Sequence, residues 1–77
     1  MVDEPLILYT RADCHLCDQV MMMLDRAGIG WRPVDIDRDS SLVSRYGLRV
    51  PVLQRGDTQE ELFFPFGEEE LRRFALQ

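Results

Sequence analysis

The feature of this sequence that most restricts its fold is a pair of cysteines at a change of local pattern. Residues 6–10, LILYT, form a continuous apolar run typical of a buried strand, and from Cys14 onward apolar residues recur at helical spacing. Cys14 and Cys17 are separated by two residues and begin that helical pattern. The pair is therefore predicted to lie where a strand leads into a helix, as a zinc site, a structural disulfide or a redox pair.

The size and charge of the chain limit the number of domains, the class of partner and the cellular compartment. The chain has 77 residues, so we expect a single domain over residues 1–77. Its net charge is −5 and its arginines are scattered, which argues against nucleic acid as a partner. No apolar run approaches the roughly 18 residues of a membrane span, and the N-terminal MVDEPL is acidic, unlike a signal peptide. We therefore expect a cytoplasmic protein without membrane contact. In the cytoplasm, reducing thiols would keep a purely structural disulfide open, which argues against that interpretation of the cysteine pair.

The remaining periodicities predict an α/β fold. Gly28 stands where a helix that starts after Cys14 would end, and Pro33 favours an edge position for the second strand. Consecutive β, α and β segments favour parallel strands with a right-handed crossover, and a later hairpin adds an antiparallel pair. The order β-α-β-α-β-β-α thus predicts a mixed four-stranded sheet with three helices. The expected elements are strand 6–10, helix 15–27, strand 31–37, a short helix within 38–47 capped by Asp39 or Ser40, strands 50–54 and 61–64, and a helix within 66–77.

The position of Cys14 favours redox chemistry. Unpaired N–H groups and the dipole at a helix N-terminus stabilise a thiolate, which is the nucleophile in thiol–disulfide exchange. Cys14 is thus the predicted attacking residue, and Cys17, one helical turn later, is the predicted resolving residue. Arg11 adds a positive charge that opposes two nearby aspartates. His15 either stabilises the thiolate when protonated or is an exposed residue without such a contact.

The residues YTRADCHLC after a first strand, VP before a third strand and a glycine before an acidic last helix together resemble the glutaredoxins of the thioredoxin superfamily. The sequence is most similar to the small bacterial glutaredoxin-like proteins of the CHLC type. The resemblance covers nearly the whole chain. It implies a thioredoxin-like fold and thiol–disulfide oxidoreductase activity, with glutathione as the reductant and a disulfide-containing protein or small molecule as the substrate of a monomer.

The same resemblance assigns binding residues. It implies a cis peptide bond between Val50 and Pro51 beside the attacking cysteine, with the Val50 backbone pairing with bound glutathione or substrate. Arg11 would meet a glutathione carboxylate, and Gly67 and Glu68 would bind the other end of that molecule. This sequence has PFGEEE where the family has a Gly-Gly and Asp segment. His15 and Leu16 take the places of the family's proline and tyrosine, and His15 is counted among the predicted binding residues.

Three other interpretations remain open. Zinc needs two further ligands, and the one histidine, His15, lies between the cysteines in a poor position to complete a tetrahedron, so we expect no metal. The second interpretation is an iron–sulfur cluster shared between two copies in a glutathione-bridged dimer, as some glutaredoxins form. The third interpretation is a non-catalytic thioredoxin-like module whose groove near Val50 holds an extended peptide, with incidental thiols.

Overall fold

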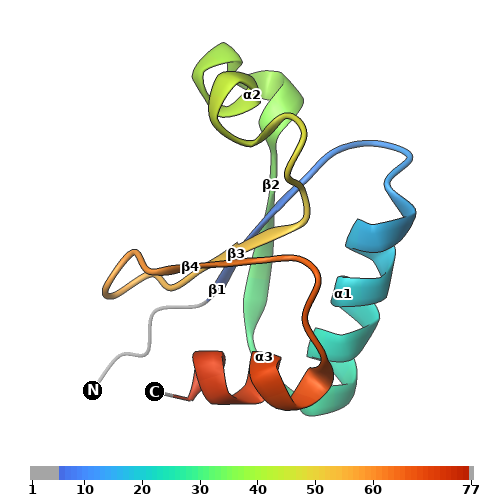
Figure 1. The fold of residues 1–77 in the computed structure, drawn as a ribbon, viewed down its shortest axis with the longest axis vertical. Helices are drawn as coiled ribbons and strands as arrows, with labels where there is room; N and C mark the ends of the chain where they lie inside the picture. Colours follow the sequence, from blue (N-terminus) through green and yellow to red (C-terminus); the bar gives the residue numbers. More distant parts are fainter. Residues whose placement is uncertain (1–5, 77) are drawn as a thin grey trace.

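The computed structural model describes residues 6–76 and confirms the predicted order of elements (Figure 1). The N-terminal residues 1–5, on which the signal-peptide argument rests, lie outside the described residues, and a single domain over residues 1–77 stays a prediction. The elements are β1 (Leu6–Thr10), α1 (His15–Ala27), β2 (Trp31–Asp35), the 3-10 turn η1 (Ile36–Arg38), α2 (Ser40–Tyr46), β3 (Val52–Gln54), β4 (Glu61–Phe63) and α3 (Glu68–Ala75).

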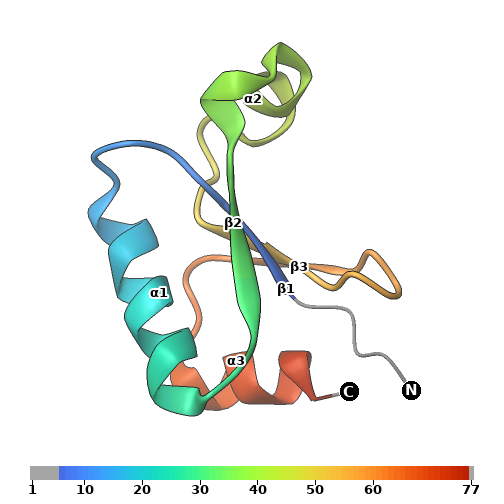
Figure 2. The same ribbon diagram turned by 180° about the vertical axis from the view of Figure 1, so that it is seen from behind.

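The four strands form one mixed sheet in the order β2-β1-β3-β4. Strand β1 pairs in parallel with β2 and antiparallel with β3, and β3 pairs antiparallel with β4. The apolar run in β1 is explained by this order, because an interior strand is covered on both faces. Strand β2 is an edge strand, as Pro33 predicted, and in the view from behind it lies in front of β1, with which it pairs (Figure 2).

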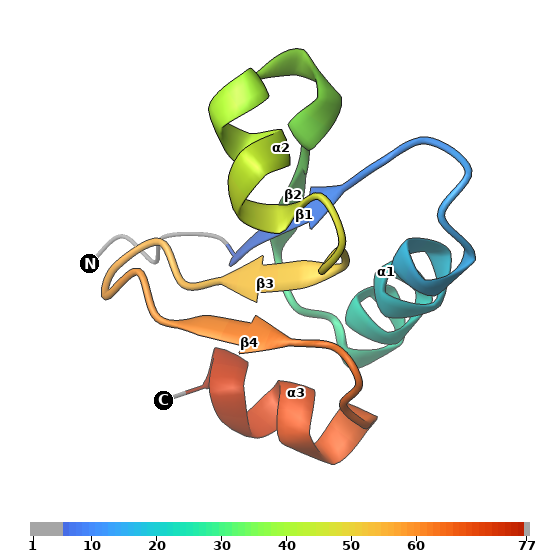
Figure 3. The same ribbon diagram turned by 45° about the horizontal axis from the view of Figure 1, so that its top comes forward.

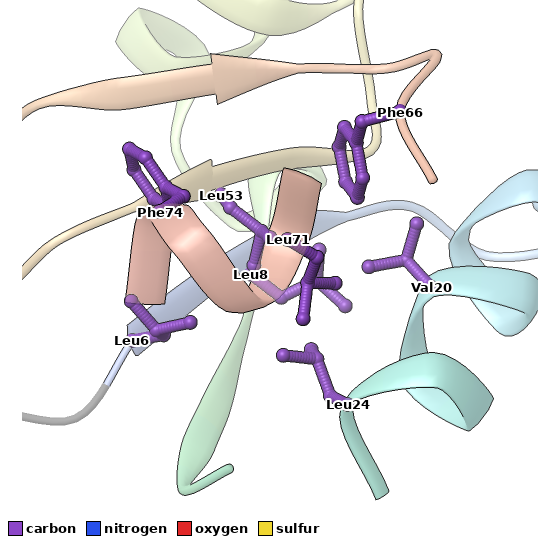
Figure 4. Close-up of a cluster of buried hydrophobic side chains, with 8 residues drawn as sticks. All are labelled: Leu6, Leu8, Val20, Leu24, Leu53, Phe66, Leu71 and Phe74. Carbon is purple, nitrogen blue, oxygen red and sulfur yellow. The ribbon is translucent and has the colours of Figure 1, made fainter. Parts of the chain in front are cut away.

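The helices cover the two faces of the sheet. Helix α2 lies on one side and α3 on the other, together with α1 (Figure 3). Alternate residues of β1 point to opposite faces, so that Leu6 and Leu8 join the larger core while Tyr9 packs against the smaller one beneath α2. The larger core comprises Leu6, Leu8, Val20, Leu24, Leu53, Phe66, Leu71 and Phe74 (Figure 4).

Side chains and turns fix where the elements end. Gly28 ends α1 in the left-handed region at φ 69°, as predicted, where a glycine has no Cβ to clash. The predicted second strand is two residues too long, because the Asp35 carboxylate accepts a hydrogen bond from the Asp37 N–H at 3.0 Å and starts the 3-10 turn. Asp39 then caps α2 through the Ser41 N–H at 2.9 Å. No helix within residues 6–76 has the length and apolar character needed to cross a membrane.

Candidate active site

Cys14 and Cys17 lie at the N-terminus of α1 and are joined by a disulfide, with their Cα atoms 5.2 Å apart. Asp13 turns the chain from the β1–α1 loop into the helix through a left-handed conformation at φ 58°, which aspartate tolerates better than most residues. Cys14 is the N-cap of α1, and its sulfur accepts a hydrogen bond from the Cys17 N–H at 3.0 Å. An amide proton and the positive end of the helix thus face the sulfur of Cys14.

The two cysteines differ in exposure. Cys14 is partly exposed, whereas Cys17, the third residue of α1, is only 1% exposed. A disulfide substrate can therefore reach the sulfur of Cys14 more readily than that of Cys17. His15, the first residue of α1, is exposed to solvent.

Arg11 links the loop before Cys14 to the region of α2. Its guanidinium donates to both carboxylate oxygens of Asp37, at 2.7 Å and 3.3 Å, and to the Gly47 carbonyl oxygen at 2.9 Å. The hydrogen bond to Asp37, together with the charge of that carboxylate, raises the pKa of Arg11 above its ordinary value. The side chain is thus oriented by Asp37 and Gly47.

The Val50–Pro51 peptide bond is cis, as predicted. Pro51 is fully buried, and it has no N–H to donate to a β-ladder, so β3 begins at Val52 rather than at the predicted Val50. A second cis bond, between Phe64 and Pro65, follows β4.

These segments border a surface groove of about 470 Å³ beside the cysteine motif. Leu16, between the two cysteines, forms one part of its lining, and Val50 forms another. We call it the Arg49 groove after its one charged residue. Its lining is Leu16, Leu48, Arg49, Val50, Phe63, Phe64 and Pro65.

Comparison with known proteins identifies the family of this chain. A family model described as "Glutaredoxin-like domain (DUF836)" matches residues 5–75. This chain belongs to that glutaredoxin-like family. No curated protein matches the chain.

Solved structures of similar proteins support the fold of this glutaredoxin-like chain. Protein XcR50 from X. campestris is 48% identical, with a TM-score of 0.82 over 90% of this chain and 92% of that one. Protein Ne2328 from Nitrosomonas europaea is 24% identical, with a TM-score of 0.81 over 97% and 94% of the two chains. The glutaredoxin Grx-1 from Archaeoglobus fulgidus is 21% identical, with a TM-score of 0.66 over 96% and 87%. The last two likenesses concern the fold alone.

The fold brings together some of the predicted site residues and separates others. Val50 lines the Arg49 groove together with Leu16, one of the two residues between the cysteines, whereas His15 does not line it. Gly67 is the N-cap of α3 and does not line that groove. Glu68 pairs with Arg26 of α1 at 3.3 Å and with Arg72 at 3.4 Å, so its carboxylate joins α3 to α1. Within residues 6–76, no group of three or more histidine, cysteine or acidic side chains is placed to hold a metal ion.

Sequence reasoning missed two features near the site. The sequence placed Asp37 only at the end of the expected strand 31–37, whereas in the structure Asp37 binds Arg11, and Asp35 and Asp39 cap the 3-10 turn and α2. It also missed Leu48 as part of the groove. No local signal indicates either role, since both depend on contacts between segments distant in the chain.

Proposed function

We propose that this glutaredoxin-like protein is a dithiol thiol–disulfide oxidoreductase in which Cys14 attacks the substrate and Cys17 resolves the intermediate. The main support is the asymmetry of the pair. Cys14 is partly exposed and faces the Cys17 N–H at the helix start, whereas Cys17 is buried. A helix N-terminus stabilises a thiolate, and accessibility directs the first attack to that sulfur.

The reaction needs two exchange steps. The Cys14 thiolate attacks one sulfur of a substrate disulfide, forms a mixed disulfide and expels the other substrate sulfur as a thiolate, which takes up a proton. Cys17 then loses its proton and attacks the sulfur of Cys14, expelling the second substrate thiolate and closing the internal disulfide. The substrate gains two electrons and the protein loses two. The disulfide between Cys14 and Cys17 in the structure is consistent with this half-reaction, which would form the same bond.

We further propose glutathione as the reductant. Two glutathione molecules would return the protein to the dithiol and leave as glutathione disulfide, which balances the electrons of the first half-reaction. Family membership and the position of Val50 in the groove that Leu16 also lines support this choice. Arg11 already donates to Asp37 and Gly47, and Glu68 already pairs with Arg26 and Arg72, so a bound glutathione would have to share these groups. Gly67 and His15 are exposed and have no such restriction.

The protein is proposed to act in the cytoplasm as a monomer on disulfide-containing proteins or small molecules. The first experiment is intact-mass spectrometry across a series of reduced-to-oxidised glutathione ratios, with Cys17→Ser alongside the wild type. The wild type should change reversibly between dithiol and internal disulfide, and Cys17→Ser should retain one glutathione on Cys14. Cys14→Ser should lose disulfide reduction.

Retained activity in Cys14→Ser would refute the assignment of the nucleophile. Thiols that stay unchanged across the glutathione series would refute the redox role altogether. The exposed apolar groove would then favour a peptide-binding module.

A further inference from the structure

The Arg49 groove has an unusual composition for this protein. The chain has 14 acidic and 9 basic residues, yet the groove has six apolar residues, one arginine and no carboxylate in its lining. Three of the apolar side chains are well exposed: Leu16 at 43%, Leu48 at 101% and Phe63 at 39%. A contiguous exposed apolar surface with a polar residue among it is typical of an interaction site.

Arg49 is oriented toward this surface by an aromatic contact. Its guanidinium carbon lies 5.6 Å from the ring centroid of Phe63, a cation–π arrangement. A cation–π contact is not a hydrogen bond to a carboxylate, so the guanidinium N–H groups of Arg49 can still donate to a ligand. Among residues 6–76, no carboxylate forms an ion pair with Arg49, whereas Arg11 is held by Asp37 and Arg55 by Asp57.

We propose that the Arg49 groove selects protein disulfides in which a cysteine is flanked by an acidic and a large apolar residue. This inference rests on the proposed function, whose substrate class it specifies. The carboxylate would pair with Arg49, and the apolar side chain would cover Leu16, Leu48 and Phe63. Leu16, which lies between the two cysteines, lines the groove, so a segment bound there would lie beside the cysteine motif.

Glutathione alone does not match all of this surface. It has carboxylates for Arg49, but no large apolar side chain to cover the exposed leucines. Burying such side chains is a main source of binding free energy, so the apolar half of the groove indicates a polypeptide ligand.

The test uses synthetic peptide disulfides that differ only beside the cysteine: Glu with Leu, Gln with Leu, Lys with Leu, and Glu with Ser. The quantity measured is kcat/KM for reduction by the wild-type protein with excess glutathione. We expect the Glu-Leu peptide to exceed the Lys-Leu peptide by about 2- to 10-fold, since one partly exposed charge pair is gained and one repulsion removed. The preference should weaken as salt is added.

Charge reversal at Arg49 provides the decisive variant. Arg49→Glu should reverse the order, so that the Lys-Leu peptide becomes the better substrate. Arg32→Glu is the matched control, because it makes the same charge change on an exposed residue of β2, the sheet edge opposite β4. This control should keep the wild-type order. Leu48→Ser should reduce the advantage of the Glu-Leu peptide over the Glu-Ser peptide.

A small neutral disulfide, hydroxyethyl disulfide, separates this inference from the proposed function. If the wild type reduces it but shows no preference among the peptides, the substrate inference is overturned while the oxidoreductase assignment stands. The same holds if Arg49→Glu slows only reactions with glutathione disulfide, because Arg49 would then serve glutathione. If the wild type reduces none of these disulfides, both proposals are overturned.

Discussion

The hydrogen bond from the Cys17 N–H to the sulfur of Cys14 yields a quantitative prediction about the reactivity of Cys14. The donor and acceptor are 3.0 Å apart. Cys17 is the third residue of α1, and its amide has no carbonyl partner within the helix, since the first backbone bond of the helix runs from the Asp18 N–H to the Cys14 carbonyl. Proline at position 17 therefore removes one donor to Cys14 and no backbone hydrogen bond of α1.

The magnitude follows from the charge of the acceptor. A hydrogen bond to a charged group contributes about 1.5–3 kcal/mol, and one pKa unit corresponds to about 1.4 kcal/mol. Removing this donor should thus raise the pKa of the Cys14 thiol by about 1–2 units. Cys17→Ala is the matched reference, because it also lacks the second thiol but keeps the amide proton.

The assay is a pH titration of the reduced variants, followed by the ultraviolet absorbance of the thiolate and by the rate of alkylation. In Cys17→Ala the pKa of Cys14 should lie below the ordinary value of about 8.5, and in Cys17→Pro it should be higher than in Cys17→Ala. Circular dichroism checks that α1 is intact in both variants. Equal pKa values in two folded variants would refute the idea that this amide activates Cys14.

Three further predictions concern the framework around the site. Arg11→Ala and Asp37→Ala break the same ion pair, so in urea denaturation the double variant should be no less stable than Arg11→Ala alone, whereas additive losses would mean that the two residues act independently. Burial, and then the hydrogen bond to Glu61, raises the pKa of Tyr46 from 10.0 to about 12. The protonated Tyr46 side chain therefore makes its full contribution to the free energy of unfolding below pH 10, and this contribution is lost as the pH rises through 12. Tyr46→Phe should consequently show a shallower loss of unfolding free energy in that interval, and an unchanged slope would contradict the role of Tyr46. Leu8→Ala, at a fully buried position, should lower the free energy of unfolding by about 2–5 kcal/mol in the same denaturation assay, and a change under about 1 kcal/mol would show that the core relaxes around it.

Much of the fold is predictable because the signals are local. Helix α1 begins after the Cys14 cap and ends at Gly28 as expected, since both depend on residues within one turn. The pairs of Glu68 with Arg72 and of Glu69 with Arg73 follow from spacing along one helix. The errors occur where a side chain or a proline interrupts a strand pattern, at Asp35 and Pro51, and at the end of β4, which stops at Phe63 instead of the predicted Phe64.

The candidate site likewise has features that local sequence predicts and features that depend on contacts between distant segments. The sequence alone predicted that two cysteines lie at a helix N-terminus, which the structure confirms, and it also predicts that the first is the better nucleophile. Both inferences are local, because backbone geometry at a helix N-terminus is the same wherever the helix is located. The sequence could not determine that Arg11 contacts Asp37 and Gly47, or that Arg49 lies over the Phe63 ring in the groove that Leu16 also lines. These contacts join segments far apart in the chain, and only the packing of the sheet and its helices decides which of several arginines is held by a carboxylate and which remains available in the groove.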